Sequence, residues 1–158
     1  MKVTAMQEYG LRCMMQLVVH GPDTPLTVRE IAEKESLTPV YVEKLLVTLR
    51  RGGLVKSQRG VNGGYALSKP ARETSVAEVL SVLGQMDLGK NMCNRFTGTA
   101  KICVHENNCG IRPVWGILTK FIYGFLSKLN LEQLIQREEK VAKDIEALWS
   151  AQQPAPLA

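Results

Sequence analysis

The fold of this chain is decided by residues 27–67, which read TVREIAEKESLTPVYVEKLLVTLRRGGLVKSQRGVNGGYAL. The capping box Thr27-Val-Arg-Glu30, whose hydroxyl and carboxylate satisfy free amides, predicts a short helix to about Glu35. Thr38-Pro39 starts a second helix, because proline costs nothing at the first helical position. The second helix ends at the glycine pair Gly52-Gly53. Its apolar stripe consists of Val42, Leu45, Leu46 and Leu49. Two short helices with a turn at Ser36-Leu37 predict a helix-turn-helix.

A β-hairpin is predicted directly after these helices. Leu54–Gln58 and Tyr65–Ser68 have the composition of short strands. The segment between them, residues 59–64, is rich in glycine and able to adopt positive φ angles. A hairpin in this place is a wing over residues 54–68, so the pattern predicts a winged helix-turn-helix.

The rest of the chain is expected to be helical, apart from one long loop. Helices are predicted over residues 3–20, from the capping box Ser75-Val-Ala-Glu78 to near Gly84, over 112–129 and over 131–149. Apolar residues cover more than one face of 112–129, which predicts burial against a second copy. The fold class is therefore mainly α with a small β-hairpin. We divide the chain into a DNA-binding domain (1–84), a cysteine loop (85–110), dimerisation helices (111–150) and a disordered tail (151–158).

Composition and charge favour an anionic partner for a soluble protein. The 158 residues are 45% hydrophobic and 22% charged, with a net charge of +5. No apolar run approaches the roughly 20 residues of a membrane span, and no leader pattern is present, so we expect a cytoplasmic protein without a membrane segment. Residues 44–72 hold seven Lys or Arg and no Asp or Glu. A solvated surface is the alternative explanation of such a charge run.

The basic block coincides with the predicted helix-turn-helix and wing, which favours double-stranded DNA as the partner. Arg59 on the wing suits a narrow minor groove, where negative potential is enhanced. Glu43 would accept a hydrogen bond from cytosine, with a salt bridge or plain exposure as its alternative. The candidate DNA-contacting residues are Thr38, Tyr41, Glu43, Lys44, Thr48, Arg50, Arg51, Arg59 and Asn62.

Three cysteines lie in the predicted loop. Cys93, Cys103 and Cys109 have nine and five residues between them, and a helix follows. In a cytosolic protein such thiols suit an iron-sulfur cluster, a zinc site completed by His105, or a thiol switch. The residues alone leave these three open. Cys13, on the apolar side of the first helix, is expected to be core.

The chain resembles the IscR/NsrR-like family of bacterial regulators over nearly its whole length. The resemblance is carried by Tyr9–Arg12, Ile31-Ala32, Tyr41–Leu45, Gly53–Gly60, Gly63–Leu67, the cysteine loop, Arg112–Trp115 and Leu129–Leu134. It implies a homodimer whose long helices cross, with two winged units on a roughly palindromic operator. It also implies a cluster on Cys93, Cys103 and Cys109, although the first interval is longer than in many members.

The resemblance further suggests a fourth ligand. Some members use an acidic residue of the partner's first helix, which matches Glu8; His105 is the second candidate. The alternative role of Glu8 is an i,i+4 ion pair with Arg12. We expect a [4Fe–4S] cluster in preference to [2Fe–2S], sensing nitric oxide or redox state ahead of iron status, and repression as the default action.

An enzymatic function is the alternative from another class. A small oxidoreductase would use the three thiols or their cluster. The sequence has no CxxC motif, no phosphate-binding glycine pattern between a strand and a helix, and no nucleophile with a paired base. We therefore expect no enzymatic activity.

Overall fold

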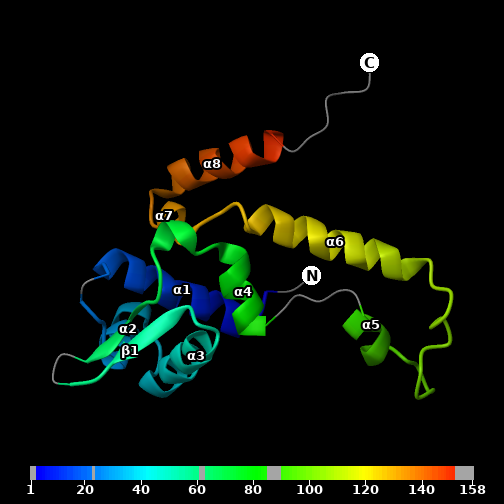
Figure 1. The fold of residues 1–158 in the computed structure, drawn as a ribbon, viewed down its shortest axis with the longest axis horizontal. Helices are drawn as coiled ribbons and strands as arrows, with labels where there is room; N and C mark the ends of the chain where they lie inside the picture. Colours follow the sequence, from blue (N-terminus) through cyan, green and yellow to red (C-terminus); the bar gives the residue numbers. More distant parts are fainter. Residues whose placement is uncertain (1–2, 23, 61–62, 85–89, 152–158) are drawn as a thin grey trace.

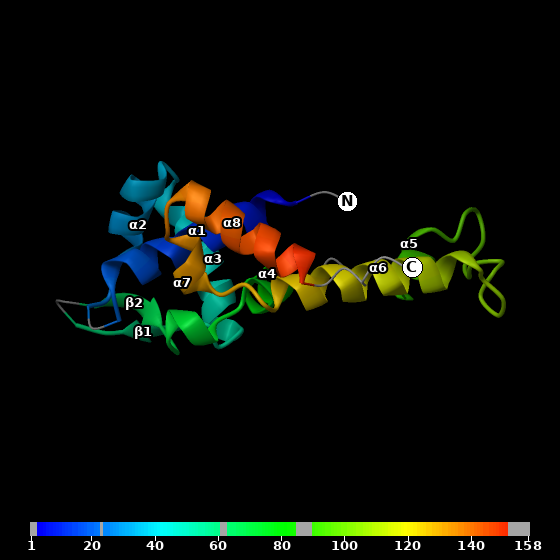
Figure 2. The same cartoon turned by 90° about the horizontal axis from the view of Figure 1, so that it is seen from above.

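The computed structural model describes residues 3–22, 24–60, 63–84 and 90–151. It is mainly helical with one two-stranded hairpin, as the sequence predicts (Figure 1). Two regions stand apart in Figures 1 and 2. We call residues 3–84 together with 127–134 the body, and residues 90–126, which extend away from it, the arm. No helix in the described part of the chain is long and apolar enough to cross a membrane.

Three helices form the base of the body: α1 (Ala5–His20), α2 (Val28–Glu35) and α3 (Pro39–Arg51). Thr4 and Gln7 form a capping box, so α1 starts after Thr4 and not at residue 3 as predicted. The predicted caps of α2 and α3 are confirmed. Ser36 between them is left-handed (φ 55°), which allows the sharp turn.

The wing is an antiparallel hairpin of β1 (Val55–Gln58) and β2 (Gly64–Leu67), with Val55 opposite Leu67. Leu26 and Tyr65 exchange backbone hydrogen bonds of 2.9 and 2.7 Å, which tie the hairpin to the segment before α2. A Cβ at Gly64 would lie 2.4 Å from the carbonyl oxygen of Leu26. Only glycine therefore permits this approach.

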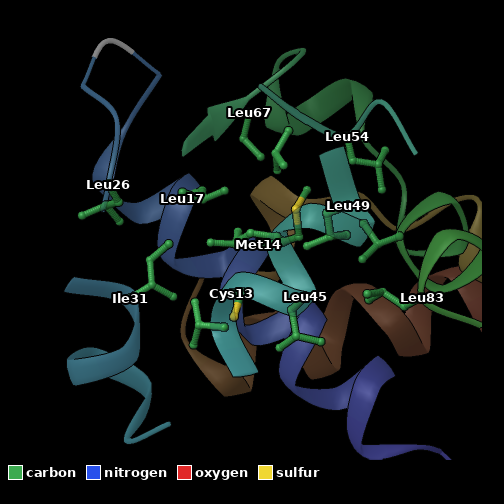
Figure 3. Packing of buried hydrophobic residues seen from close by; sticks show 14 of the residues in the cluster. Cys13, Met14, Leu17, Leu26, Ile31, Leu45, Leu49, Leu54, Leu67 and Leu83 are labelled. Atoms are coloured by element: carbon green, nitrogen blue, oxygen red, sulfur yellow. The ribbon is translucent and has the colours of Figure 1, made fainter. Parts of the chain in front are cut away.

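The turn η1 (Ala71–Glu73) and the helix α4 (Val76–Gly84) complete the body before the arm. Ser75 and Glu78 form the predicted capping box. The core joins all four helices and the wing (Figure 3). Its members include Cys13, Met14, Leu17, Ile31, Leu45, Leu49, Leu67, Val79 and Leu83.

The arm contains α5 (Lys90–Arg95) and α6 (Ile111–Leu126). The prediction of a loop throughout 85–110 is therefore wrong for α5. A helix of six residues is too short to show an apolar period in sequence. Residues 85–89 lie outside the described part.

The predicted helix over 131–149 is instead two helices, α7 (Leu131–Leu134) and α8 (Glu138–Ser150). Arg137 is extended (φ −61°, ψ 142°), and this breaks the helical hydrogen-bond series. Leu131 is fully buried in the core, and its amide donates to the Thr74 carbonyl at 3.0 Å. Within the chain, α7 therefore belongs to the body, and the assignment of 111–150 to dimerisation stays a prediction. Most of the predicted tail, residues 152–158, lies outside the described part.

Candidate functional site

Helix α3 presents a polar face opposite the core. Its apolar residues Val42, Leu45, Leu46 and Leu49 are buried. The candidate DNA-contacting residues Thr38, Glu43, Lys44, Arg50 and Arg51 are exposed. Burial of one side of an amphipathic helix thus fixes which side chains face outward. Glu43 forms no ion pair with any described residue, so its salt-bridge alternative is not observed.

Two of the candidates make contacts within the protein. The Tyr41 ring is half-buried and lies edge-on to Tyr9, with 6.0 Å between ring centroids. The Thr48 hydroxyl donates to the Lys44 carbonyl at 2.9 Å. Tyr41 therefore connects the start of α3 to α1.

The wing continues the basic surface beyond α3. Arg50 donates from Nη1 to the Ser57 hydroxyl at 3.3 Å, which links α3 to β1. Arg59 is exposed just past the end of β1. Gly60 after it has φ +117°, so the turn depends on glycine there. Asn62 lies outside the described residues.

Sequence reasoning missed Val40, whose side chain is 79% exposed at the start of α3. The apolar stripe used to predict α3 begins at Val42, and Val40 lies off that stripe. Thymine methyl groups are read by apolar contact in the major groove. Val40 therefore adds an apolar element to a surface otherwise predicted from charge.

A buried carboxylate fixes α1 against α2. Glu35 accepts hydrogen bonds from Arg12 Nε at 2.6 Å and from Gln16 Nε2 at 2.5 Å. The pKa of Arg12 is raised, chiefly by this hydrogen bond to Glu35. Arg12 also lies over the Tyr9 ring, 5.4 Å from its centroid. The network joins both helices to the tyrosine pair at the start of α3.

Glu8 has no ion-pair partner within 4 Å among the described residues, although its charge contributes to the raised pKa of Arg12. The alternative ion pair with Arg12 does not form, because Arg12 binds Glu35 instead. The Glu8 side chain is exposed on α1 and makes no hydrogen bond or ion pair with another described residue. In Figure 1 the cysteine segment lies at the far end of α6 from the body. Glu8 is thus free to meet a group from outside the chain.

The three cysteines of the arm line one cavity. Cys93 comes from α5, Cys103 from the segment after it, and Cys109 from the entrance to α6. The cavity has a volume of about 390 Å³, and each thiol is half-exposed. Its other lining residues are Phe96, His105, Ile111, Arg112 and Trp115. The sequence prediction that these thiols belong together is consistent with this placement.

The three cysteines are brought together only as lining residues of this cavity. Among the described side chains, no three from His, Cys, Asp or Glu could hold a single metal ion. Zinc requires its ligands to converge, because all of them bind one atom at about 2.0–2.3 Å. The thiolates of a cluster bind different iron atoms. An iron-sulfur cluster and a zinc ion with His105 as a ligand therefore both stay predictions for this cavity.

Arg112 is a second residue of the site that sequence reasoning missed. Its Nη2 donates to the Glu106 carbonyl at 2.6 Å and reaches the His105 carbonyl at 3.5 Å. The pKa of Arg112 is raised, first by a hydrogen bond to the Cys93 side chain and further by the charges of Cys93, Cys109 and Cys103. Its position three residues after Cys109, at a helix start, was the available signal.

Cys13 has a different environment from the other cysteines. It is fully buried in the core, as predicted (Figure 3). Burial raises the pKa of its thiol to about 12, assisted by the Glu35 charge. A thiol held neutral in this way is an inert packing group.

A family model described as that of Rrf2, iron-dependent transcriptional regulators, matches residues 3–137. The chain belongs to the Rrf2 family. The HTH-type transcriptional regulator IscR of Photorhabdus laumondii is 32% identical over 139 residues, covering 88% of this chain and 82% of the relative. Protein rrf2 of Nitratidesulfovibrio vulgaris is 29% identical over 141 residues, covering 86% of this chain and 88% of the relative.

Solved structures of the family share the fold. The T. potens IscR structure has a TM-score of 0.64 and 29% identity, covering 98% of this chain and 93% of that one. CymR, the global cysteine regulator of B. subtilis, has a TM-score of 0.67 and 25% identity, covering 85% and 96%. Together with the family match, they identify this Rrf2 protein as a DNA-binding transcription regulator and not an enzyme.

Proposed function

We propose that this Rrf2 regulator controls its operator affinity through an iron-sulfur cluster bound at the cavity of the arm. The observation that carries the proposal is the placement of Cys93, Cys103 and Cys109 around that one cavity. Thiolates are the usual ligands of such clusters. The matching family is itself described as iron-dependent. When bound, the cluster supplies a group that nitric oxide, oxidants and iron scarcity alter.

We assign the fourth ligand to Glu8 of a second copy. Glu8 is exposed and lacks an ion-pair partner among the described residues. An oxygen ligand holds iron less tightly than a thiolate, so this position is suited to ligand exchange. His105 lines the cavity and is the second candidate. The [4Fe–4S] form remains our preference, since each of its four irons takes one protein ligand.

The second copy is supplied by dimerisation through α6. This helix has no buried residue, although Ile111, Val114, Ile117, Leu118 and Phe121 are all exposed apolar residues on it. They follow a helical spacing and therefore form one stripe. Phe121 packs edge-on against Trp149 of α8, but the stripe as a whole stays exposed. A long exposed apolar helix face marks an interaction surface. We propose a homodimer that places two recognition helices on a roughly palindromic, double-stranded operator.

Helix α1 would carry the cluster state to the DNA-binding surface. Glu8 is followed by Tyr9, which packs on Tyr41 at the start of α3. One turn on, Arg12 binds Glu35 of α2. Movement of α1 on engagement of Glu8 therefore changes the position of both helices of the helix-turn-helix. Couplings of this kind amount to about 1–3 kcal/mol.

Anaerobic native mass spectrometry tests cluster, ligands and dimer together. We expect a dimer whose excess mass corresponds to iron and sulfide, and Cys103→Ala should lose that mass while the dimer remains folded. Cys13→Ala is the matched control and should retain it, because Cys13 is in the core. A zinc mass, or a wild-type protein without acid-labile sulfide, contradicts the proposal.

The assignment of Glu8 has its own test. Glu8→Ala should change the absorption of the cluster or speed its decay under nitric oxide and oxygen. Glu33→Ala removes an exposed carboxylate of α2 that pairs with Arg29 among the described residues, and it should change neither the absorption nor the decay. Identical spectra and decay rates for wild type and Glu8→Ala would exclude Glu8 as a ligand.

A further inference from the structure

Arg112 occupies a position that the helix field disfavours. It is the second residue of α6, where the partial positive charge of a helix start attracts acidic and repels basic side chains. No acidic residue lies in the first turn of α6, and Gly110 provides no side-chain cap. Arg112 also forms no ion pair with a carboxylate among the described residues. Its compensation must come from another acceptor.

The acceptors are in the cysteine segment. Arg112 donates to the carbonyls of Glu106 and His105, which lie between Cys103 and Cys109. It lines the cavity together with all three cysteines. The planar guanidinium has five donor hydrogens, so it binds backbone carbonyls and a sulfur simultaneously. One side chain thus touches both the loop backbone and the cavity.

We propose that Arg112 is the positioning residue of the cysteine site, closing residues 103–109 onto the start of α6 and placing a fixed positive charge before the three thiolates. This inference rests on the proposed cluster. Arg112 is not itself a ligand, because a guanidinium stays protonated and has no lone pair to donate. Its charge offsets the repulsion among the thiolates and the sulfides of the cluster.

The fixed charge has a consequence for redox behaviour. A bound cluster would gain a negative charge on one-electron reduction by an external donor, and a nearby cation would favour that reduced form. Arg112 would therefore raise the reduction potential of a bound cluster. The carbonyl contacts have a separate consequence, since they hold the backbone between Cys103 and Cys109 whether or not a cluster is present.

Three variants separate charge from geometry. Arg112→Met removes both the cation and the carbonyl donors. Arg112→Lys keeps the charge but loses the planar fork. Arg95→Met is the matched control, because it removes an exposed cation of α5 that does not line the cavity. The measurements are the reduction potential of the cluster, the rate of iron loss to a chelator, and amide hydrogen exchange of residues 103–109 in cluster-free protein.

In Arg112→Met we expect a more negative potential, severalfold faster iron loss and severalfold faster exchange. Arg112→Lys should have a reduction potential close to that of wild type but should lose the exchange protection of residues 103–109. Arg95→Met should resemble wild type in all three measurements. Potential and exchange unchanged in Arg112→Met, or an equal shift of the potential in Arg95→Met, would overturn the inference. A wild-type protein without a cluster would refute the proposed function and the role of the charge. The exchange data on the same protein would still decide the contact with the loop.

Discussion

The body buries its apolar residues, whereas the arm leaves many of its apolar residues exposed. In the body, helices from α1 to α4 and the wing share one core, and residues such as Leu45 and Val42 are fully buried. In the arm, α6 is equally rich in apolar residues but buries none of them; Ile117 is 68% exposed. Apolar burial is the main favourable term in folding, so the body is stabilised within one chain. Helix α6 has ring contacts with Trp149 but leaves an apolar face exposed.

This difference explains how the molecule can be regulated. A DNA-binding surface with its own core keeps its shape, so regulation acts on where the two surfaces lie relative to each other. In the proposed mechanism the arm provides that control, because dimerisation and the group held by its cysteines would order it. Segments of low intrinsic stability are the ones that move in regulation.

Ile117→Asp is expected to have the largest effect on this contrast. The charge is placed in the exposed apolar stripe of α6 and should dissociate the dimer, while the body remains folded. Operator affinity should fall by about a hundredfold or more, because the two half-sites are no longer bound by one linked molecule. Sedimentation and DNA binding measure both effects. Lys120→Asp, a larger charge change at a polar position of α6, is the control; an Ile117→Asp dimer would place the interface elsewhere.

Leu45→Ala tests whether the body is stabilised by its own core. It should lower the free energy of unfolding by about 2–5 kcal/mol, as cavity-forming substitutions do. Ile117→Ala, an apolar truncation at an exposed position, should leave the unfolding of a monomeric variant nearly unchanged. Urea denaturation of both variants in a background made monomeric by Val114→Asp, another position of the exposed stripe, provides the measurement. Equal losses would show that body and arm share one core.

The same contrast decides how much of the molecule the sequence could predict. The body was predicted nearly completely, because capping boxes at Thr27 and Ser75 and the glycine-rich wing are local signals with fixed spacing. The split between α7 and α8 was not predicted. It depends on Leu131 being held in the core by Thr74, and such a long-range contact leaves no periodic signal.

For the site, the sequence predicted those residues whose type limits their role, and missed those whose role depends on where the side chain points. The cysteines could be grouped, because thiols have few roles in the cytosol. Arg112 and Val40 were missed, since their significance lies in where they point: one toward the cysteine cavity, the other out of a buried helix. The alternative ion pair between Glu8 and Arg12 is not observed, because Arg12 pairs with Glu35, which only the fold brings near.

Arg59→Ala tests whether the surface of the body contacts DNA independently of the arm. Arg59 is exposed at the tip of β1, so its loss should leave fold and dimer intact. Operator affinity should fall by about 1–3 kcal/mol, and preference for a narrow minor groove should weaken. Fluorescence anisotropy with operators of different groove width measures both. Arg29→Ala, an exposed cation of α2 paired with Glu33, is the control; equal losses would assign Arg59 to general charge only.

Alkylation rates compare body and arm through their cysteines, without any change to the fold or to DNA binding. In cluster-free protein at pH 8, iodoacetamide should modify Cys93, Cys103 and Cys109 readily, because they are half-exposed. Cys13 should react at least about a hundredfold more slowly, since its modification requires opening of the core. Mass spectrometry of labelled peptides over time distinguishes the four sites. Comparable rates at Cys13 would show that the body opens as easily as the arm.

The pH dependence of stability follows from the same thiol. The pKa of Cys13 is raised to about 12 in the folded body, whereas the pKa of a thiol in an unfolded chain is about 8.5. The unfolded state therefore loses its proton first as pH rises. The contribution of the neutral thiol is complete below about pH 8.5 and is lost progressively toward pH 12. Between pH 8 and 10, the unfolding free energy of wild type should fall more steeply than that of Cys13→Ala, and parallel curves would mean that Cys13 ionises without disturbing the core.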